Sequence, residues 1–385
     1  RAKSVKINLL SINPIDLLWK NQPRKPCSKA FILKIKYSGK STQNKISYIK
    51  SILRFNKIDN YILTSPDSIA WLLNMRGNDI VNTPFNLVYL IISLNKKVEL
   101  FINLKKINNI QNKISKFVNS NSLESINNFL SNLDKTKIVS FDIKRTPIIF
   151  QKICQENNLQ IKYFDDPIIY PKAQKNKIEI IGAQKANLRD GLSLTKFLYW
   201  LKKEIVIKNT NEIKAANKLL QLRKKNYLFY SPSFDTISAI DSNAAIPHYR
   251  VSKKTNKNFK NNSIYLIDSG AQYLDGTTDI TRTVIIGIPT DEQKDRFTRV
   301  LKGHIAVATC NFLKNTNGRR IDKLARKSLQ DIGLDYEHGT GHGVGSFASV
   351  HEDPQRITKF QILNEGVIKK NMILSNEPGY YKKNE

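Results

Sequence analysis

The sequence predicts two successive domains, an α/β domain followed by an α+β domain. The 385 residues exceed the roughly 100 to 200 of one ordinary domain. Short strand-like runs alternate with helical patterns in the first part of the chain, whereas long amphipathic helices come first after Pro171. We therefore expect a linker with the tail of a preceding domain over residues 1–45, an α/β domain over 46–170 and an α+β domain over 171–385.

The elements of the α/β domain follow from apolar periodicity and turn residues. Three prolines among the first 26 residues and the polar stretch 38–45 predict the linker that precedes it. Ser65 is a suitable N-cap for a helix that begins near Asp67, and Asn95–Lys97 would close a hairpin. The other expected helices cover Tyr48–Phe55, Ile107–Phe117 and Leu123–Leu133, and the expected strands cover Tyr61–Thr64, Val88–Leu94, Val98–Ile102, Ile138–Phe141 and Ile161–Phe164.

The elements of the α+β domain are longer. Apolar residues at helical spacing between Ile178 and Leu201 predict extended helices. The Asp275-Gly276 pair is a turn signal between two strands. Further helices are expected over Glu212–Phe229, Gln293–Phe312 and Ile321–Ile332, and strands over Thr236–Ile240, Tyr265–Asp268, Thr277–Ile288 and Met372–Ser375.

The charge of the chain is strongly positive. It has 63 Lys and Arg against 32 Asp and Glu, a net charge of +31, which favours nucleic acid or an acidic membrane surface as a partner. Lys, Asn and Ile are abundant throughout, however, which indicates a compositional drift rather than one basic patch. Because no aromatic residues interleave with basic ones as a base-stacking surface requires, and no zinc-finger spacing occurs, nucleic acid is not an expected partner.

Apolar runs and cysteines bear on the location of the protein. No apolar run approaches the roughly 18 residues that a membrane span needs, so we expect no membrane association. Cys27, Cys154 and Cys310 are widely separated and form no C-x-x-C pair. This usage indicates a reducing compartment, and we expect a cytoplasmic protein.

Two carboxylates are placed to meet on one face of a sheet. Asp268 ends an apolar strand, and Asp279 follows 11 positions later (279 − 268 = 11). If Asp275 and Gly276 are the central turn residues, Asp279 lies opposite Gln272, which has the same parity as Asp268. Two such carboxylates repel each other unless a cation lies between them. The alternative is that one caps a turn and the other faces solvent.

Histidines are rare and clustered. Three of the five lie within 15 residues, as His338, His342 and His351, and glycines alternate through the first part of that segment. Glycine allows close backbone approach, which a loop around a cation or a peptide needs. His248 follows a proline at a predicted strand start, and His304, within a predicted helix, is interpreted as structural.

Glu377 completes a candidate metal site. It ends a strand before the Pro378-Gly379 turn, and turn chemistry alone would explain it. Together with two Asp and a loop His, however, it forms an oxygen-rich ligand set with one imidazole. Such a set suits Mn²⁺, Co²⁺ or Zn²⁺ in a two-metal hydrolase.

Four motifs resemble aminopeptidase P, the Xaa-Pro aminopeptidases. They are YLIDSGAQYLDGTTDITRT at Tyr265–Thr283, HGTGHGVGSF at His338–Phe347, VHE at Val350–Glu352 and EPGYY at Glu377–Tyr381. Upstream, SIAWLLNMRGN at Ser68–Asn78 resembles the middle domain of the long, three-domain form, and RKPC at Arg24–Cys27 resembles the linker before it. The resemblance implies a creatinase-like domain with a mixed sheet, followed by a catalytic domain of the pita-bread fold, a curved antiparallel sheet flanked by helices.

The resemblance also implies the metal ligands and cofactors. Asp268 would bind one metal, Asp279 would bridge both, and His342 and Glu377 would hold the pair from the other side. The cofactors would be two divalent ions, with Mn²⁺ preferred over Co²⁺ and Zn²⁺. A hydroxide between them would be the nucleophile.

Four residues would act on the substrate by the same resemblance. Glu377 would receive the proton of the water, and His351 would stabilise the tetrahedral intermediate. His248 would contact the scissile carbonyl, and His338 would line the proline pocket.

The activity implied is release of the N-terminal residue from peptides whose second residue is proline, by a protein that forms a homodimer when intact. The alternatives are a prolidase that acts on Xaa-Pro dipeptides and a non-catalytic binding module of the same fold. The upstream resemblance weighs against the prolidase, and retention of Asp268, Asp279, His342 and Glu377 weighs against the module.

Two departures from the family accompany the resemblance. A further Glu, in a strand of the form R-I-E-N, is expected beyond Glu385, so the chain is expected to be an interior fragment whose own activity is impaired. Asn376 stands where Asp is usual before Glu377, which is expected to alter hydrogen bonding beside the metals.

Overall fold

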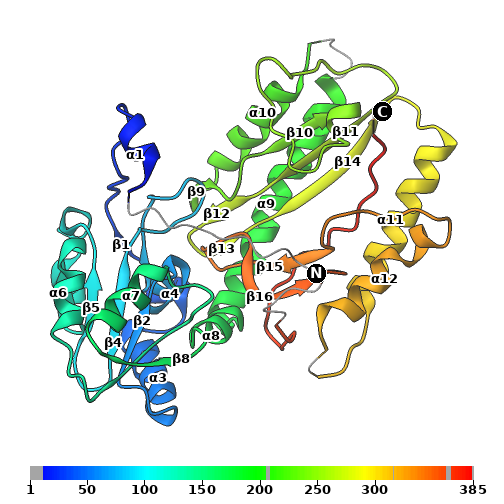
Figure 1. Ribbon diagram of the computed structural model, residues 1–385. Helices are drawn as coiled ribbons and strands as arrows, with labels where there is room; N and C mark the ends of the chain where they lie inside the picture. Colours follow the sequence, from blue (N-terminus) through cyan, green and yellow to red (C-terminus); the bar gives the residue numbers. More distant parts are fainter. Residues whose placement is uncertain (1–11, 205–208, 315, 361–365, 384–385) are drawn as a thin grey trace.

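The structure, a computed structural model, describes residues 12–204, 209–314, 316–360 and 366–383. Its two parts lie side by side in Figure 1, the first in blue to teal and the second in green to red. None of the helices in these ranges is both long and apolar enough to cross a bilayer.

The first domain is built on a six-stranded mixed sheet in the order β6-β5-β4-β2-β7-β8. β2–β4 and β4–β5 pair antiparallel, whereas β5–β6, β2–β7 and β7–β8 pair parallel. The strands are β2 (Asn60–Leu63), β4 (Tyr89–Ser93), β5 (Val98–Phe101), β6 (Val118–Asn121), β7 (Ile138–Phe141) and β8 (Gln160–Tyr163).

Helices cover both faces of this sheet, because its central strands are apolar on both sides. On β4, Leu90 and Ile92 belong to one apolar cluster and Ile91 to the other. The first cluster includes residues of α3 (Thr42–Phe55) and α4 (Pro66–Leu73), and the second includes residues of α6 (Ile126–Ser131) and α7 (Ile148–Glu156). The hairpin of β4 and β5 agrees with the expected one.

Two differences from expectation concern this domain. The long helix expected over Ile107–Phe117 is replaced by two short helices, η1 (Leu104–Lys106) and α5 (Gln111–Ile114), which suffice to bury the isoleucines of that stretch.

Residues 28–45, predicted as linker, pack on the domain instead. Ala30 is fully buried and donates its N–H to the Lys106 carbonyl. The elements there are β1 (Phe31–Ile32), which pairs with β3 (Met75–Arg76), and α2 (Ile35–Ser38), while α1 (Pro14–Leu18) lies exposed before them and η2 (Leu123–Ser125) precedes α6.

The second domain begins after α8 (Ile169–Ala173) with two long helices, α9 (Lys177–Glu204) and α10 (Glu212–Lys224). In the described part of this domain the strands form three small antiparallel sheets, β10-β11-β14, β13-β12-β9 and β15-β16. The strands are β9 (Phe229–Pro232), β10 (Ile237–Ile240), β11 (Ser263–Ser269), β12 (Ala271–Tyr273), β13 (Gly276–Thr277), β14 (Ile280–Ile286), β15 (Gly341–Gly343) and β16 (Glu352–Ile357), with η4 (Asp241–Asn243) after β10.

Helices α9 and α10 cover one face of the β10-β11-β14 sheet (Figure 1). Burial alternates along β11, so Tyr265 and Ile267 face these helices while Asp268 faces the opposite side. The remaining helices, α11 (Asp291–Thr309) and α12 (Gly318–Gln330), pack against each other on the far side of β14 from the first domain. Asp268, on the other face of β11, is directed away from helices α9 and α10.

Two strand predictions are corrected. The run Thr277–Ile288 is not one strand but β13 and β14 with Thr278 and Asp279 between them. The expected strand over Met372–Ser375 is reduced to a single bridge between Leu374 and Gly343, because β15 provides only three residues to pair with.

Candidate metal centre

A change of sheet at Gly270 brings the two aspartates together. Asp268 pairs with Thr281 and Ser269 pairs with Ile280, so Asp279 lies opposite Gly270, not opposite Gln272 as expected. The tight turn is centred one residue earlier than the Asp275-Gly276 signal indicated, since Tyr273 pairs with Gly276, and this moves the strand partner of Asp279 by two residues. A shift of two residues preserves the parity of a strand, so the prediction of a shared face is unaffected.

The close approach of the strands requires Gly270. A Cβ at this position would lie 2.0 Å from the carbonyl oxygen of Thr278 and 2.2 Å from Oγ of Ser233. Thr278 in turn donates its N–H to the Ala271 carbonyl at 2.9 Å. The bend expected at Gly270 is therefore present, and it separates β11 from β12.

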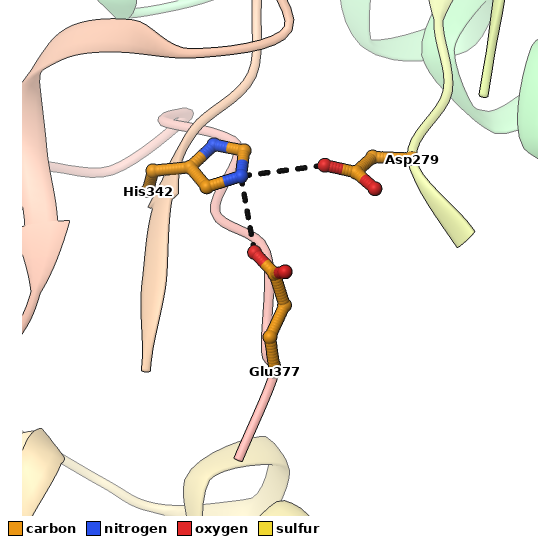
Figure 2. A group of neighbouring side chains, drawn as sticks. All are labelled: Asp279, His342 and Glu377. Carbon is orange, nitrogen blue, oxygen red and sulfur yellow. Dashed lines mark ion pairs between the residues drawn. The ribbon is translucent and has the colours of Figure 1, made fainter. Parts of the chain in front are cut away.

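Three candidate ligands meet at one point (Figure 2). Nε2 of His342 lies 3.3 Å from Oδ2 of Asp279 and 3.0 Å from Oε1 of Glu377. One ligand atom from each residue lies within 4.8 Å of the others. Because the three residues come from separate segments of the second domain, this group of atoms depends on the tertiary fold.

Backbone pairing places Glu377 beside His342. The Ser375 N–H donates to the His342 carbonyl at 2.9 Å, and the Glu377 N–H donates to the Thr340 carbonyl at 2.7 Å. The Ser375 hydroxyl donates to the Glu377 carboxylate and accepts from the His342 N–H. Segment 375–377 thus runs along β15 although it is not a regular strand.

The His342 ring is oriented by the backbone of the next residue, Gly343. Nδ1 lies 2.9 Å from the Gly343 carbonyl, which can only accept, so Nδ1 is the donor and Nε2 is directed at the carboxylates. Burial lowers the pKa of His342, but the hydrogen bonds to Asp279 and Glu377 outweigh it and raise the pKa to about 10. The two carboxylates therefore strongly favour a positive charge at this point.

The surroundings of Asp268 also favour a cation. Its Oδ1 is buried and has no hydrogen-bond partner among the described residues. Burial first, and then the charge of Asp279, raise the pKa of Asp268 to about 7. A partnerless buried carboxylate oxygen beside two further carboxylates and an imidazole fits the oxygen-rich ligand set of Mn²⁺, Co²⁺ or Zn²⁺.

Two further histidines lie near this cluster. The His351 ring is exposed and stands edge-on to His342, with 4.2 Å between ring centroids. His338 accepts a hydrogen bond from the Tyr381 hydroxyl at 2.9 Å, since its Nδ1 faces the Gly339 carbonyl. Burial raises the pKa of Glu377, but the contacts with His342 and the hydrogen bond from Ser375 outweigh it and lower that pKa below its usual value.

The remaining two histidines are apart from the three ligands of Figure 2. His248 is exposed, adopts a φ of 61°, and makes no hydrogen bond or ion pair in the part of the chain that the structure describes. Its proposed contact with substrate stays a prediction. His304, interpreted as structural, faces the Asn376 carbonyl through Nδ1 at 3.1 Å and accepts from the Asn376 side chain through its own carbonyl.

A buried ion pair behind the aspartates was not predicted. Arg223 of α10 pairs with Asp190 of α9 at 2.7 Å. Arg223 also faces the carbonyls of Ser269 and Gly270, and Asp190 accepts a hydrogen bond from the Thr278 hydroxyl at 2.9 Å. The pair thus contacts the residues next to Asp268 and Asp279.

The sequence does carry a signal for this pair. Asp190 falls on the apolar stripe of α9, four residues after Ala186 and four before Leu194. Arg223 follows Leu219 by four residues on α10. A charge at a core position of an amphipathic helix indicates a buried partner.

Family models match nearly the whole chain. One described as metallopeptidase family M24 matches residues 182–385, and one described as the creatinase/prolidase N-terminal domain matches residues 21–179. "Xaa-Pro aminopeptidase 1" of Dictyostelium discoideum is 40% identical over 365 residues, which are 94% of this chain and 58% of that protein. A "probable Xaa-Pro aminopeptidase P" of Laccaria bicolor is 38% identical over 98% of this chain and 60% of its own length.

Solved structures agree with these matches. An X-prolyl aminopeptidase of Caenorhabditis elegans, described as a cytosolic enzyme with a di-nuclear active site, has a TM-score of 0.91 and 34% identity over 97% of this chain and 62% of its own. A prolidase of Pyrococcus horikoshii, 22% identical, has a TM-score of 0.68 over 88% of this chain and shares the fold. The chain spans about three fifths of the length of the curated relatives named above.

Proposed function

Because this chain belongs to metallopeptidase family M24, we propose that the complete protein is a metal-dependent aminopeptidase that releases the N-terminal residue from peptides with proline second. The expected fold, a creatinase-like domain followed by a pita-bread domain, is confirmed. The observation that carries the proposal is the group of Asp279, His342 and Glu377 within 4.8 Å, in a chain 40% identical to a relative named for this activity.

Asp268, Asp279, His342 and Glu377 are the proposed ligands of two divalent cations, with Mn²⁺ first and Co²⁺ or Zn²⁺ as alternatives. When bound, such ions supply an activated water at neutral pH and polarise the carbonyl to be attacked. The name of the nematode relative, with its di-nuclear site, supports a pair rather than a single ion. The partnerless Oδ1 of Asp268 supports its inclusion.

Residues of the chain itself would transfer the proton, stabilise the developing charge and bind the substrate. Glu377 accepts the proton from the attacking water, and the Ser375 hydroxyl that donates to it keeps its carboxylate in place. His351, exposed beside His342, donates to the oxygen on which negative charge develops. His248 contacts the scissile carbonyl, and His338, held by Tyr381, lines the pocket for the proline ring.

Selectivity for proline has a physical basis. A proline nitrogen carries no N–H and its ring fixes φ, so peptidases that need that donor or an extended backbone cannot use such bonds. A pocket shaped for the ring selects them instead. The description of the nematode relative as cytosolic supports a cytosolic location for the complete protein.

Cleavage assays test the function directly. The complete protein, loaded with Mn²⁺, would be incubated with an Xaa-Pro-Xaa peptide, its Xaa-Ala-Xaa counterpart and an Xaa-Pro dipeptide, and the products would be identified by mass spectrometry. We expect a free N-terminal residue from the first peptide only. Cleavage of the dipeptide alone would instead identify a prolidase, and cleavage of none would reject peptidase activity.

A further inference from the structure

A short loop carries His351 between two anchored ends. The loop, residues 346–352, leaves the segment after β15 and enters β16 at Glu352. Its inner residues are buried, with Phe347 fully enclosed, whereas His351 itself is exposed toward His342. The position of His351 therefore depends on what holds the rest of the loop.

Arg76 of the first domain holds the start of this loop. Its side chain is 3% exposed, and its Nε donates to the Phe347 carbonyl at 2.6 Å, with Nη2 3.5 Å from the Ser346 carbonyl. Nη1 donates to the Ala70 carbonyl at 2.7 Å within the first domain. Among the described residues no carboxylate forms an ion pair with Arg76, so its planar donors serve backbone oxygens of both domains.

Aromatic packing supports the same contact. The Phe347 ring lies 6.2 Å from Phe31, the β-strand partner of Arg76, and 5.2 Å from Tyr230 of β9. The Arg76 guanidinium lies 5.7 Å from the Phe347 ring centroid. Phe347 adopts a φ of 47°, a left-handed conformation that costs free energy unless surrounding contacts impose it.

The other end of the loop is held by buried charges. Glu352 is 3% exposed and binds Lys175 through one oxygen, while Lys172 lies 3.6 Å from the other. Lys172 also pairs with Asp67 of the first domain at 2.6 Å. One residue further on, Asp353 pairs with Arg145 of the first domain at 2.9 Å.

We propose that the first domain, together with α8 and Lys175 that follow it, acts as a clamp on this loop, with Arg76 and the Glu352–Lys175 pair as positioning residues that hold His351 over the metal site. The inference rests on the proposed role of His351 in stabilising the reaction's developing negative charge. It assigns the non-catalytic domain a direct part in turnover: together with α8 and Lys175, it fixes both ends of the loop that carries His351.

The clamp is first tested without activity. Arg76→Lys keeps the charge but replaces the planar donors by a single ammonium, so amide hydrogen exchange of residues 345–352 should speed up in the complete protein. Lys106→Met, which removes a buried cation paired with Asp79 elsewhere in the first domain, is the matched control and should leave this loop unchanged. Unaltered exchange in Arg76→Lys would overturn the clamp whatever the enzyme does.

Kinetics of the Mn²⁺-loaded complete protein give the second test. Arg76→Lys and Glu352→Gln should each lower kcat by up to about 10²-fold, since small misplacements of a catalytic group have effects of this size. KM and bound manganese should stay within about twofold of the parent. Because the two substitutions act at opposite ends of the loop, the kinetic test can still be made if one of the variants does not fold.

A double-mutant cycle separates positioning from general damage. In a His351→Ala background, Arg76→Lys should cause no further loss of kcat, because the group it positions is already absent. Additive losses would reject the clamp. If His351→Ala alone leaves kcat unchanged while exchange in the loop still responds to Arg76→Lys, the role of His351 fails and the structural clamp stands.

Discussion

At the scale of single residues, His342 balances the charge of the cluster. Its Nε2 contacts two carboxylates, and the pKa of about 10 means that the imidazole is protonated at neutral pH in the metal-free chain. Asp268, with a pKa of about 7, is then partly neutral. Divalent cations would replace these protons, because ligands must be deprotonated to bind metal.

Asp279→Ala should remove metal binding while preserving the fold. Asp279 is the proposed bridge, and its carboxylate is one of the two that lie with the His342 imidazole in the cluster. In the complete protein we expect loss of bound manganese by elemental analysis and no detectable cleavage of an Xaa-Pro-Xaa peptide. The exposed Asp291 provides the control variant, Asp291→Ala. Near-parental activity in Asp279→Ala would refute the ligand assignment.

His351→Ala should separate metal binding from turnover. The ring contacts His342 but is not among the three grouped ligand residues. Removal of a donor to a developing oxyanion lowers kcat by about 10²- to 10³-fold, with manganese content unchanged. Loss of manganese on the same substitution would mean that His351 is itself a ligand.

At the scale of elements, the spacing of the two aspartates is set by the helices behind them. Arg223 of α10 faces the carbonyls of Ser269 and Gly270, and Asp190 of α9 binds the Thr278 hydroxyl. Such contacts orient ligands without touching the metal. The buried ion pair thus links the helical layer to the sheet at the point where β11 gives way to β12.

Thr278→Val tests this link with little change in volume. It removes the hydroxyl that binds Asp190 and accepts the Ala271 N–H. The affinity of the complete protein for Mn²⁺ should fall by about 10- to 100-fold, as measured by calorimetry, with circular dichroism unchanged. Thr283→Val, at an exposed site on β14, should bind Mn²⁺ like the parent. Equal affinities for both variants would show that the helices do not influence the site.

At the scale of the whole molecule, the stability of the fold depends on pH through a buried carboxylate, Asp166. Asp166, at the end of the first domain, accepts hydrogen bonds from Ser68 and from the Ile168 N–H. Burial raises its pKa from the usual 3.8 to about 6. The folded state therefore binds this proton more tightly than the unfolded state does, so the stability contributed by Asp166 is present below about pH 4 and is lost as pH rises to about 6.

Asp166→Asn should remove this dependence, since the amide imitates the protonated acid. At 1.36 kcal/mol per pH unit the gain at pH 7 is up to about 3 kcal/mol, with little change at pH 4. Urea unfolding of the chain at both pH values would measure it. Asp165→Asn, at the exposed neighbouring position, should show no such difference. A higher urea midpoint at pH 4 but not at pH 7 would contradict the sign.

Local features of this protein could be predicted from its amino-acid sequence alone. The short apolar run Ile138–Phe141 predicted β7, and the hairpin of β4 and β5 followed from two apolar runs joined by Asn95–Lys97. Parity along the chain also predicted the shared face of Asp268 and Asp279, because the side chains of a strand alternate whatever its exact register.

How segments that are distant in the chain meet could not be predicted in this way, because it depends on packing across the whole fold. The approach of Glu377 to His342 and the contact of Arg76 with the His351 loop each join residues that no local pattern relates. Asp190 and Arg223 could each be recognised in the sequence as a charge on an apolar stripe, but the sequence did not show that these two residues pair with each other. Short-range periodicity reports which face of an element is buried, whereas the partner of that face is selected by packing across the whole fold.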